Sequence, residues 1–292
     1  MKQIRKSLSP TVVTIGNFDG LHRGHLKLIE KTKALAVKNG LKSLVCGFNC
    51  NTKGAELLTT QKQLKTYLEE LDIDCYTALN FPQIKDMSCE MFASQYLYNT
   101  LQARFVVVGE NFRFGKNQSG DINTLIAMGK QYGFKVYPIK MYRVGKQILS
   151  SSYLRNLLQS GKISLANRYL YREFSFLGIV KKGYCAGTQI LQIPTANLAI
   201  PKYLCPIPFG VYATKVTIDK KEYNSITNVG YAPTYKKTKP VAETYVFDFN
   251  GNLYGKSIQV SFYKYIRKER KFSSMYALKK QIEKDISICK QQ

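Results

Sequence analysis

The stretch TVVTIGNFDGLHRGHLKLIEKTKALAVKNG, residues 11–40, constrains the fold of this chain more than any other. Its β-branched opening, residues 11–15, ends at Gly16 and predicts a short buried strand. From His25 onward the apolar residues recur at helical spacing, and Gly40 is a typical helix stop. The stretch therefore predicts a strand, a glycine-bracketed loop and a helix, in that order.

Similar strand-like runs recur at residues 43–48, 105–108 and 134–139, with helical stretches between them. This alternation predicts βαβ units on a parallel sheet. In open sheets of this kind, ligands bind outside the carboxyl ends of the strands. We therefore expect the glycine-bracketed loop to lie at the ligand edge of the sheet.

The two histidines of the chain, His22 and His25, both lie where this loop enters the helix. Residues at i and i+3 lie on the same side of a helical turn, so both imidazoles could reach one phosphate group. Gly16 and Gly20 let the backbone turn tightly, and Gly24 removes a side chain that would block a ligand. The helix N-terminus favours an anion, and imidazoles can donate hydrogen bonds to phosphate oxygens during phosphoryl transfer.

Other interpretations of the loop are weaker on the residues alone. Residues 109–116 nearly match a Walker loop, but their glycine spacing is one residue too long and Asn117 replaces the hydroxyl. A histidine pair at this spacing could bind zinc, yet no third protein ligand of the right kind lies nearby. The seven cysteines lack metal or redox spacing, and we interpret them as reduced structural thiols.

After residue 172 the pattern changes to short alternating strands. We expect these strands at residues 174–180, 211–218, 223–229, 241–249 and 257–266. A helix over residues 273–289, with Ser273 as its N-cap, would close a compact antiparallel barrel. The predicted fold class is therefore α/β plus all-β, with a parallel-sheet domain at residues 1–172 and a barrel domain at residues 173–292.

The barrel half contains one chemically suggestive segment, GYCAGTQILQIPTAN, residues 183–197. Gly183 and Gly187 permit a mobile loop near phosphates. Pro194 fixes the backbone before Thr195 and Asn197, whose oxygen-bearing side chains a strand would point the same way. Such hard oxygen ligands suit Mg²⁺, although Pro-Thr and Asn are also common in turns.

The formal net charge of +25 admits a nucleic acid or another polyanion as partner. The lysines are spread along the chain, however, which favours a solvated surface that attracts anionic substrates. We find no apolar run typical of a secretory signal or a membrane-spanning helix. We therefore expect a cytoplasmic protein with small-molecule substrates and with no nucleic-acid or membrane partner, and the sequence does not define an oligomeric state.

Three segments of the first half carry a resemblance to a known family. GNFDGLHRGH resembles the HxGH signature of the nucleotidylyltransferase superfamily, and TIGNFDG before it is similar to that of bacterial bifunctional riboflavin kinase/FMN adenylyltransferases, the FAD synthetases. Residues 106–116, with residues 119–121, resemble the flavin-side loop of that family. SSSYLR, residues 150–155, resembles its SSTxIR element. The resemblance implies a Rossmann-like nucleotidylyltransferase domain.

In this family the HxGH histidines are catalytic, which implies that role for His22 and His25. The resemblance implies an ATP-binding set for adenylylation that consists of Gly16, Asn17, Phe18, Asp19, Gly20, His22, Gly24, His25, Ser151, Ser152 and Arg155. It implies a flavin-binding set that consists of Asn111, Phe112, Arg113 and Phe114. A serine triplet that opens an amphipathic helix can also be an ordinary helix cap.

The second half resembles the riboflavin kinase domain of the same family. Residues 183–197 and then residues 210–212, 228–230, 243–245, 253–255 and 266–272 follow that domain in order. The resemblance implies that Gly183, Gly187, Pro194, Thr195 and Asn197 bind ATP, with Mg²⁺ on Thr195 and Asn197.

It also implies that Glu243 deprotonates the ribityl 5′-hydroxyl and that both Glu243 and Arg267 contact the flavin. By residue type alone, Glu243 would be an exposed carboxylate and Arg267 a solvated member of a basic run.

These observations predict an enzyme that converts riboflavin and ATP to FMN, and FMN and a second ATP to FAD. Two positions depart from the family: residues 49–54 lack its usual proline and histidine, and Gln192 replaces a glycine. The alternatives are a flavin-binding protein with one activity or none, another HxGH nucleotidylyltransferase, and a nucleic-acid-binding protein.

Overall fold

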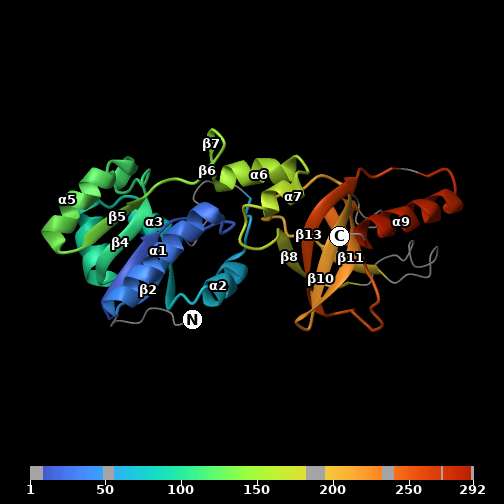
Figure 1. Ribbon diagram of the computed structural model, residues 1–292, viewed down its shortest axis with the longest axis horizontal. Coiled ribbons are helices and arrows are strands. Elements are labelled where there is room, and N and C mark those ends of the chain that lie inside the picture. Colours follow the sequence, from blue (N-terminus) through green and yellow to red (C-terminus); the bar gives the residue numbers. More distant parts are fainter. Residues whose placement is uncertain (1–8, 49–55, 182–194, 232–239, 271, 291–292) are drawn as a thin grey trace. The chain divides into compact units, whose positions relative to one another are not determined.

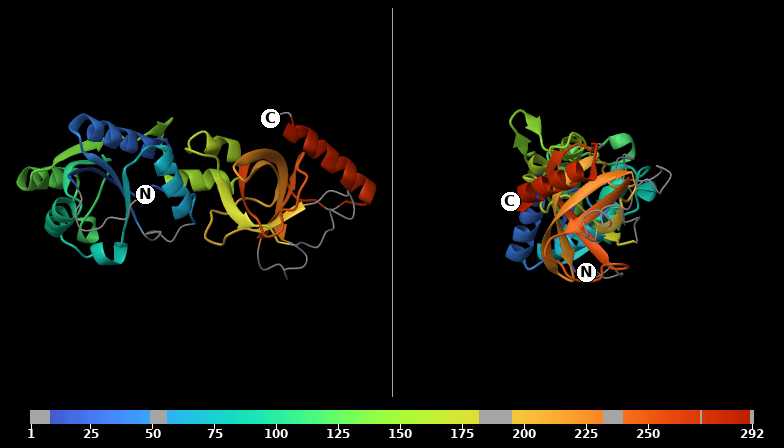
Figure 2. Two further views of the ribbon diagram at one scale, coloured as in Figure 1. Left: turned by 90° about the horizontal axis from the view of Figure 1, so that it is seen from below. Right: turned by 90° about the vertical axis from the view of Figure 1, so that its right-hand side faces the viewer.

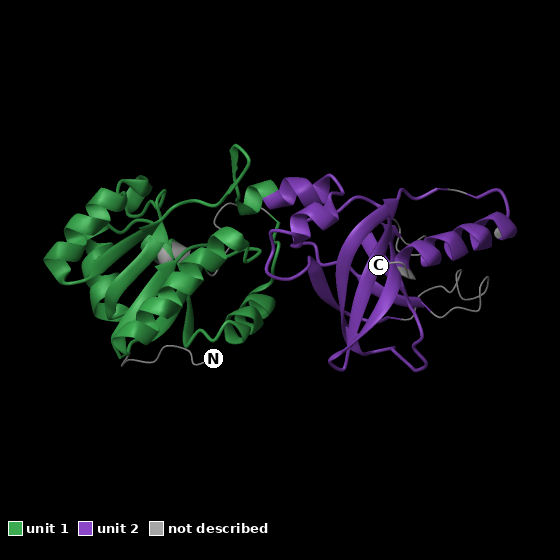
Figure 3. Ribbon diagram, viewed as in Figure 1, with its two compact units in different colours: residues 1–153 green, residues 154–292 purple. Residues whose placement is uncertain are grey.

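The computed structural model describes residues 9–48, 56–181, 195–231, 240–270 and 272–290. The chain divides into two compact units, residues 1–153 and residues 154–292 (Figure 3). The sequence pattern placed the division at residues 172/173, and the segment between the two positions contains most of α6 (Ser151–Gln159) and all of α7 (Ile163–Asn167). The units are described separately below.

The first unit is built on a five-stranded parallel sheet with the strand order β3-β2-β1-β4-β5 (Figure 1). The strands are β1 (Thr11–Ile15), β2 (Lys42–Phe48), β3 (Cys75–Leu79), β4 (Ala103–Gly109) and β5 (Lys135–Ile139). β1 is buried along its whole length, as its β-branched sequence predicts. β1 lies between β2 and β4, and the strand order changes sides there: β2 and β3 lie on one side of β1, and β4 and β5 lie on the other. The loop after β1 therefore lies at the ligand edge of the sheet.

Helices cover the sheet of the first unit. They are α1 (Arg23–Asn39), α2 (Gln61–Glu70), α3 (Phe81–Ile84), α4 (Cys89–Met91), the π-helix η1 (Phe92–Thr100), the 3-10 turn η2 (Lys116–Gln118) and α5 (Ile122–Tyr132), and a hairpin of β6 (Arg143–Val144) and β7 (Gln147–Ile148) follows β5. One face of the sheet forms a hydrophobic core with η1 and α5, which includes Val13, Leu97 and Leu125. α1 packs on β1, β2 and β4 and ends at Gly40, whose φ of 63° gives a left-handed cap.

The second unit is a six-stranded antiparallel sheet with the strand order β8-β13-β10-β11-β12-β9. Its strands are β8 (Ser175–Ile179), β9 (Thr195–Ala199), β10 (Gly210–Ile218), β11 (Lys221–Tyr231), β12 (Pro240–Val246) and β13 (Ser257–Arg267). The amide of Lys181, directly after β8, donates to the carbonyl of Asn197 on β9 at 2.9 Å, which joins the two edge strands. The predicted barrel is therefore confirmed.

The C-terminal helix α9 (Met275–Lys290) lies along the outside of the barrel against β10 and β11 (Figure 2). Its first turn is capped by Ser274, whose Oγ accepts a hydrogen bond from the amide of Ala277 at 3.2 Å. The predicted cap at Ser273 is thus wrong by one residue. None of the helices in the described part of the chain combines the length and the apolar character that a bilayer crossing requires.

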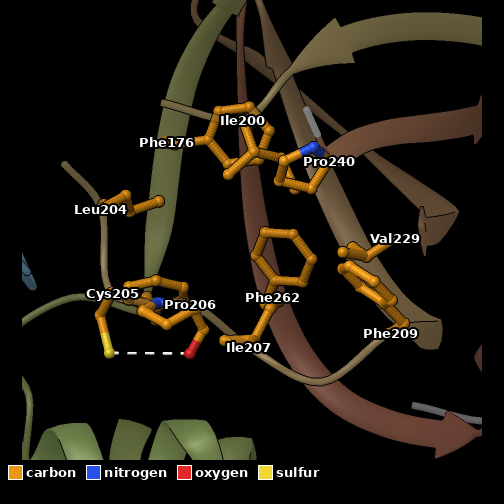
Figure 4. Close-up of a pocket in the computed structure, with 11 residues that line it drawn as sticks. Phe176, Ile200, Leu204, Cys205, Pro206, Ile207, Phe209, Val229, Pro240 and Phe262 are labelled. Atoms are coloured by element: carbon orange, nitrogen blue, oxygen red, sulfur yellow. Dashed lines mark hydrogen bonds between the residues drawn. The ribbon is translucent and has the colours of Figure 1, made fainter. Parts of the chain in front are cut away.

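The inside of the barrel is a packed core. Four buried hydroxyl groups form a chain across it: Thr214 to Ser225 at 2.8 Å, Thr214 to Thr227 at 2.8 Å, and Thr227 to Thr244 at 2.9 Å. Aromatic rings fill one end of the core, around a small apolar cavity of about 50 Å³ that Figure 4 shows between Phe176, Phe262 and the loop that precedes β10.

Candidate functional site

The loop after β1 ends at His22, which caps the N-terminus of α1. Its backbone is extended, with φ −73° and ψ 167°, and its Nδ1 accepts a hydrogen bond from the amide of His25 at 3.3 Å. The two imidazoles are stacked, with ring centroids 3.7 Å apart and an interplanar angle of 16°. The structure thus brings both predicted catalytic histidines together in one place.

Burial keeps both rings neutral. Loss of solvation lowers the pKa of His22, which is 5% exposed, to about 4. The pKa of His25 is lowered well below its ordinary value by burial and secondarily by the neighbouring His22. Because Nδ1 of neutral His22 accepts a hydrogen bond, its proton is on Nε2, which can donate to a phosphate oxygen.

Asp19 holds the loop in place. This carboxylate is 6% exposed, and its Oδ1 accepts backbone hydrogen bonds from Leu58 at 2.8 Å and Thr59 at 3.1 Å. Its carbonyl oxygen accepts a hydrogen bond from the hydroxyl of Ser151 at 2.9 Å. Two residues of the predicted ATP-binding set, Asp19 and Ser151, are therefore bonded to each other and tie the loop to the start of α6.

The loop itself is strained. Phe18 and Leu21 are fully buried and adopt positive φ values of 47° and 39°, which cost non-glycine residues energy. Gly20, with φ 84°, takes the same region without a steric penalty. The ring of Phe18 lies 5.2 Å from that of His25, so the strained turn packs directly against the histidine pair. Asn17 is half-buried beside it.

Gly24 has a more specific role than the sequence suggested. A Cβ atom at this position would lie 3.0 Å from Cε1 and 3.1 Å from Nδ1 of His22. The space that the missing side chain leaves is therefore taken by the His22 ring. Gly16 is similar, because a Cβ there would lie 3.4 Å from the ring of Phe18.

The predicted flavin loop follows β4. Asn111 and Arg113 are exposed, and the guanidinium of Arg113 lies 3.7 Å from the carboxylate of Asp121, the residue that caps α5. Phe114, by contrast, is 6% exposed and packs in the hydrophobic core, with its ring stacked on Phe112 at 5.8 Å. Phe114 anchors the loop, and Phe112, which is half-buried, is the aromatic ring nearer the surface.

The serine triplet opens α6 as expected. Ser150 accepts a hydrogen bond from the amide of Tyr153 at 3.2 Å, which makes it a helix cap, while Ser152 is exposed. Arg155 is 8% exposed and belongs to the part of α6 in the second unit. Its place in an ATP site with the histidines stays a prediction.

In the second unit, three polar side chains form a row on the outer face of the barrel. Glu243 on β12 is paired directly with Asn197 on β9 and with Asn228 on β11. The neighbours of Asn197 on its strand, Ala196 and Leu198, are buried in the barrel, so Thr195 and Asn197 share the outer face as predicted. We call Asn197, Glu243 and Asn228 the polar row.

Glu243 is half-buried rather than exposed, so the interpretation of this residue as a solvated strand carboxylate is wrong. Loss of solvation, with a secondary contribution from Glu269, raises its pKa above the ordinary value. A carboxylate with a raised pKa is a stronger proton acceptor once it is ionised. Such a group suits the deprotonation of an alcohol.

Arg267 is not a solvated member of a basic run either. Its Nε and Nη2 bind the carboxylate of Asp285 on α9, with distances of 2.9 Å and 2.7 Å to Oδ2. Asp285 is 1% exposed and also accepts a hydrogen bond from Gln281 at 2.7 Å. The pair fastens α9 to the end of β13.

The sequence interpretation assigned no site role to Asn228 or Glu269, although both lie in segments that resemble the family, and it missed Asp285. A signal existed for Asp285, because it lies on the apolar side of α9 between Ile282 and Ile286, where a carboxylate needs a partner. The partner lies 18 residues away in the sequence and becomes adjacent only when α9 folds back on the barrel.

Some of the positions singled out in the sequence lie outside the residues that the structure describes, namely Gly183, Gly187, Gln192, Pro194 and the segment 49–54. Among the described residues, no group of three or more His, Cys, Asp or Glu side chains could hold a metal ion. The donors that fit Mg²⁺ here are of another kind: Thr195 and Asn197 offer hard oxygen atoms on one face, next to the carboxylate of Glu243.

A parallel sheet with a histidine pair at its ligand edge, followed by a barrel with amide and carboxylate groups in a row, defines a two-domain phosphate-transferring enzyme. Two family models match the chain: FAD synthetase over residues 4–153 and riboflavin kinase over residues 170–292. The chain belongs to the family of bifunctional riboflavin kinase/FMN adenylyltransferases.

Relatives with that name cover almost the whole chain. The protein from Buchnera aphidicola subsp. Schizaphis graminum is 37% identical over 98% of this chain and 95% of its own length. The Bacillus subtilis protein is 33% identical over 97% and 92%, and the Escherichia coli K12 protein is 32% identical over 94% and 90%. A crystal structure described as a macrolide-efflux protein from Streptococcus pneumoniae has a TM-score of 0.89 and 25% identity, over 98% of this chain and 96% of that one.

Proposed function

We propose that this chain makes FAD from riboflavin in two steps, with one step in each unit. The barrel unit phosphorylates riboflavin with ATP to give FMN and ADP, and the parallel-sheet unit joins FMN to AMP from a second ATP. The observation that carries this assignment is the match of the two family models, each to the greater part of a different compact unit.

In the adenylylation step, a phosphate oxygen of FMN attacks the α-phosphorus of ATP. The new P–O bond forms as the bond to the β-phosphate oxygen breaks, and pyrophosphate leaves with the bonding electrons. His22 and His25 are neutral, so His22 stabilises the transferring phosphates through Nε2–H and not as a full cation. Because FMN supplies the nucleophile, no covalent enzyme intermediate is required.

In the kinase step, Glu243 accepts the proton of the ribityl 5′-hydroxyl as its oxygen attacks the γ-phosphorus of ATP. ADP leaves, and the products are FMN and protonated Glu243. Thr195 and Asn197 would hold Mg²⁺, which supplies positive charge to the phosphate oxygens. The pairing of Asn197 with Glu243 on neighbouring strands supports this proposal, because the proposed nucleotide ligand and the proposed base are then adjacent.

The remaining assignments follow the family pattern. Asn111, Phe112 and Arg113 would contact FMN in the first unit, and Phe114 would hold their loop from the core. In the second unit Gly183, Gly187 and Pro194 would contact ATP, and Arg267 would contact the flavin while bonded to Asp285. The proposal includes the cytoplasmic location expected from the sequence.

Two variants test the division of labour, with products separated by chromatography. His25→Ala should abolish FAD formation from supplied FMN and leave FMN formation from riboflavin intact. Glu243→Ala should block riboflavin phosphorylation and leave adenylylation of supplied FMN intact. Val37→Ala, at a 76% exposed position of α1, is a control that should change neither step. If each variant damaged both steps equally, the assignment of one reaction to each unit would be wrong.

A further inference from the structure

The polar row ends at Asn228, a side chain to which the proposed reaction has given no role. Asn228 lies on β11 directly opposite Glu243, and residues so paired have Cβ atoms about 5 Å apart. On the other side of Glu243 lies Asn197, the proposed nucleotide ligand. Glu243, the proposed base, therefore lies between two side-chain amides, and one of them, Asn197, is the proposed ATP ligand.

The orientation of the Asn228 amide is fixed by a second carboxylate. Its Nδ2 donates a hydrogen bond to Oε1 of Glu269 at 3.0 Å. Because an ionised carboxylate only accepts hydrogen bonds, the NH₂ end of the amide must face Glu269 and the carbonyl oxygen must point away from it. The second N–H of the amide is not used by this bond.

The position of the Glu269 side chain depends on Gly230. This glycine lies two residues after Asn228 on β11, so both belong to the same face of the strand. A Cβ atom at residue 230 would overlap Oε1 of Glu269 and would lie 2.7 Å from its Cδ. Any side chain there would push Glu269 away and release the amide of Asn228.

In-line transfer requires the acceptor hydroxyl to approach the γ-phosphate from the side opposite the leaving ADP. With the nucleotide on the Asn197 side of Glu243, the acceptor comes from the Asn228 side. When the 5′-hydroxyl is at Glu243, the 4′- and 3′-hydroxyls follow at about 1.5 Å per C–C bond, which brings them within reach of an amide about 5 Å away.

We propose that Asn228 binds the hydroxyls of the ribityl chain next to the 5′ end, and that Glu269 positions its amide for this contact. Asn228 is then a specificity residue that selects a polyol over a plain alkyl chain. Glu269 acts through Asn228 and is a positioning residue. This inference rests on the proposed kinase function of the barrel unit.

The test compares riboflavin with a flavin that carries a 5-hydroxypentyl chain, which keeps the terminal hydroxyl and lacks the others. Asn228→Ala should lower kcat/KM for riboflavin about tenfold, as expected for the loss of one or two hydrogen bonds to substrate, and should leave kcat/KM for the hydroxypentyl flavin nearly unchanged. Asn224→Ala, an exposed position on the same strand, is the matched control and should change neither value.

The positioning role of Glu269 is tested by three further variants. Glu269→Gln retains an acceptor oxygen for Asn228 and should stay close to the parent enzyme with riboflavin. Glu269→Ala and Gly230→Ala both release the amide and should raise KM for riboflavin more than they lower kcat, without changing the hydroxypentyl reaction. Thermal melting of each variant shows whether the barrel is still folded.

An equal loss of kcat/KM for both flavins in Asn228→Ala, or no loss for riboflavin, would overturn the proposal. Failure of the proposed kinase function is recognised separately. In that case either the parent protein does not phosphorylate riboflavin, or Glu243→Ala still does. If Glu269→Gln behaved like Glu269→Ala, Glu269 would act through its charge and the positioning role would be wrong.

Discussion

Gly24→Ala should stabilise α1 but disturb the geometry of the histidine pair, His22 and His25. Gly24 lies in the first turn of α1, where alanine is the better helix former by up to about 1 kcal/mol. On propensity alone, the substitution would raise the melting temperature of the unit by about 2–4 °C. The new Cβ, however, would lie 3.0 Å and 3.1 Å from two atoms of the His22 ring.

Carbon atoms in good contact are about 3.5–4.0 Å apart, so the His22 ring must move by about half an ångström. His22 is stacked on His25 at 3.7 Å, and the displacement is therefore passed to both donors. Since a misplacement of about 1 Å can cost about a hundredfold in rate, we expect kcat for adenylylation to fall by about tenfold.

The assay measures FAD formed from supplied FMN and ATP, with riboflavin phosphorylation and thermal melting recorded on the same preparation. The expected result is a protein that melts no lower than the parent, phosphorylates riboflavin at the parent rate and makes FAD more slowly. Unchanged FAD formation would refute the inference that the space beside His22 is needed. A parallel fall of both activities would refute its confinement to the first unit.

Two further predictions concern stability. Since the pKa of His22 is about 4 in the folded chain and about 6.5 in the unfolded chain, the unfolded state takes up a proton first, and the unfolding free energy should fall by about 3 kcal/mol between pH 6.5 and pH 4. His22→Asn, which keeps a helix-capping side chain, should reduce this loss in urea titrations followed by circular dichroism, and an unchanged pH dependence would contradict the cause. Asp285→Ala should cost about 3–5 kcal/mol because it leaves the guanidinium of Arg267 without its buried partner. Asp219→Ala, which removes a surface pair with Lys256 at a 77% exposed carboxylate, should cost less than about 1 kcal/mol, and equal losses would contradict the role of burial.

Periodicity alone was sufficient to predict most of the regular elements. The strands β1, β2, β4 and β5, five strands of the barrel and the helices α1 and α9 lie where apolar spacing placed them, within a few residues. β3 was missed because CYTAL is short and lies beside polar residues, so its strand conformation depends on pairing with β2. The π-helix Phe92–Thr100 also has no periodic signal that separates it from an α-helix.

The site was predicted only in part, because sequence patterns identify residues but not their partners. Spacing showed that His22 and His25 could meet, but it did not show the strained turn that packs Phe18 against the ring of His25. Glu243 was identified by resemblance alone. Its neighbours Asn228 and Glu269 come from two other strands or their ends, and only the register of the barrel brings the three together.

The contrast between the two sites follows from the nucleophile that each must use. In adenylylation the attacking group is the phosphate of FMN, which carries about −1.5 to −2 charges at pH 7 and has no proton that must be removed. That step needs no general base, and under the proposed assignment the two neutral imidazoles of His22 and His25 would supply hydrogen-bond donors without trapping the anion in its ground state. In the kinase step the attacking group is an alcohol, which must lose its proton, and there the chain has a half-buried carboxylate with a raised pKa. Under the proposed assignment, an exchange of these groups would leave each unit with chemistry that its substrate cannot use.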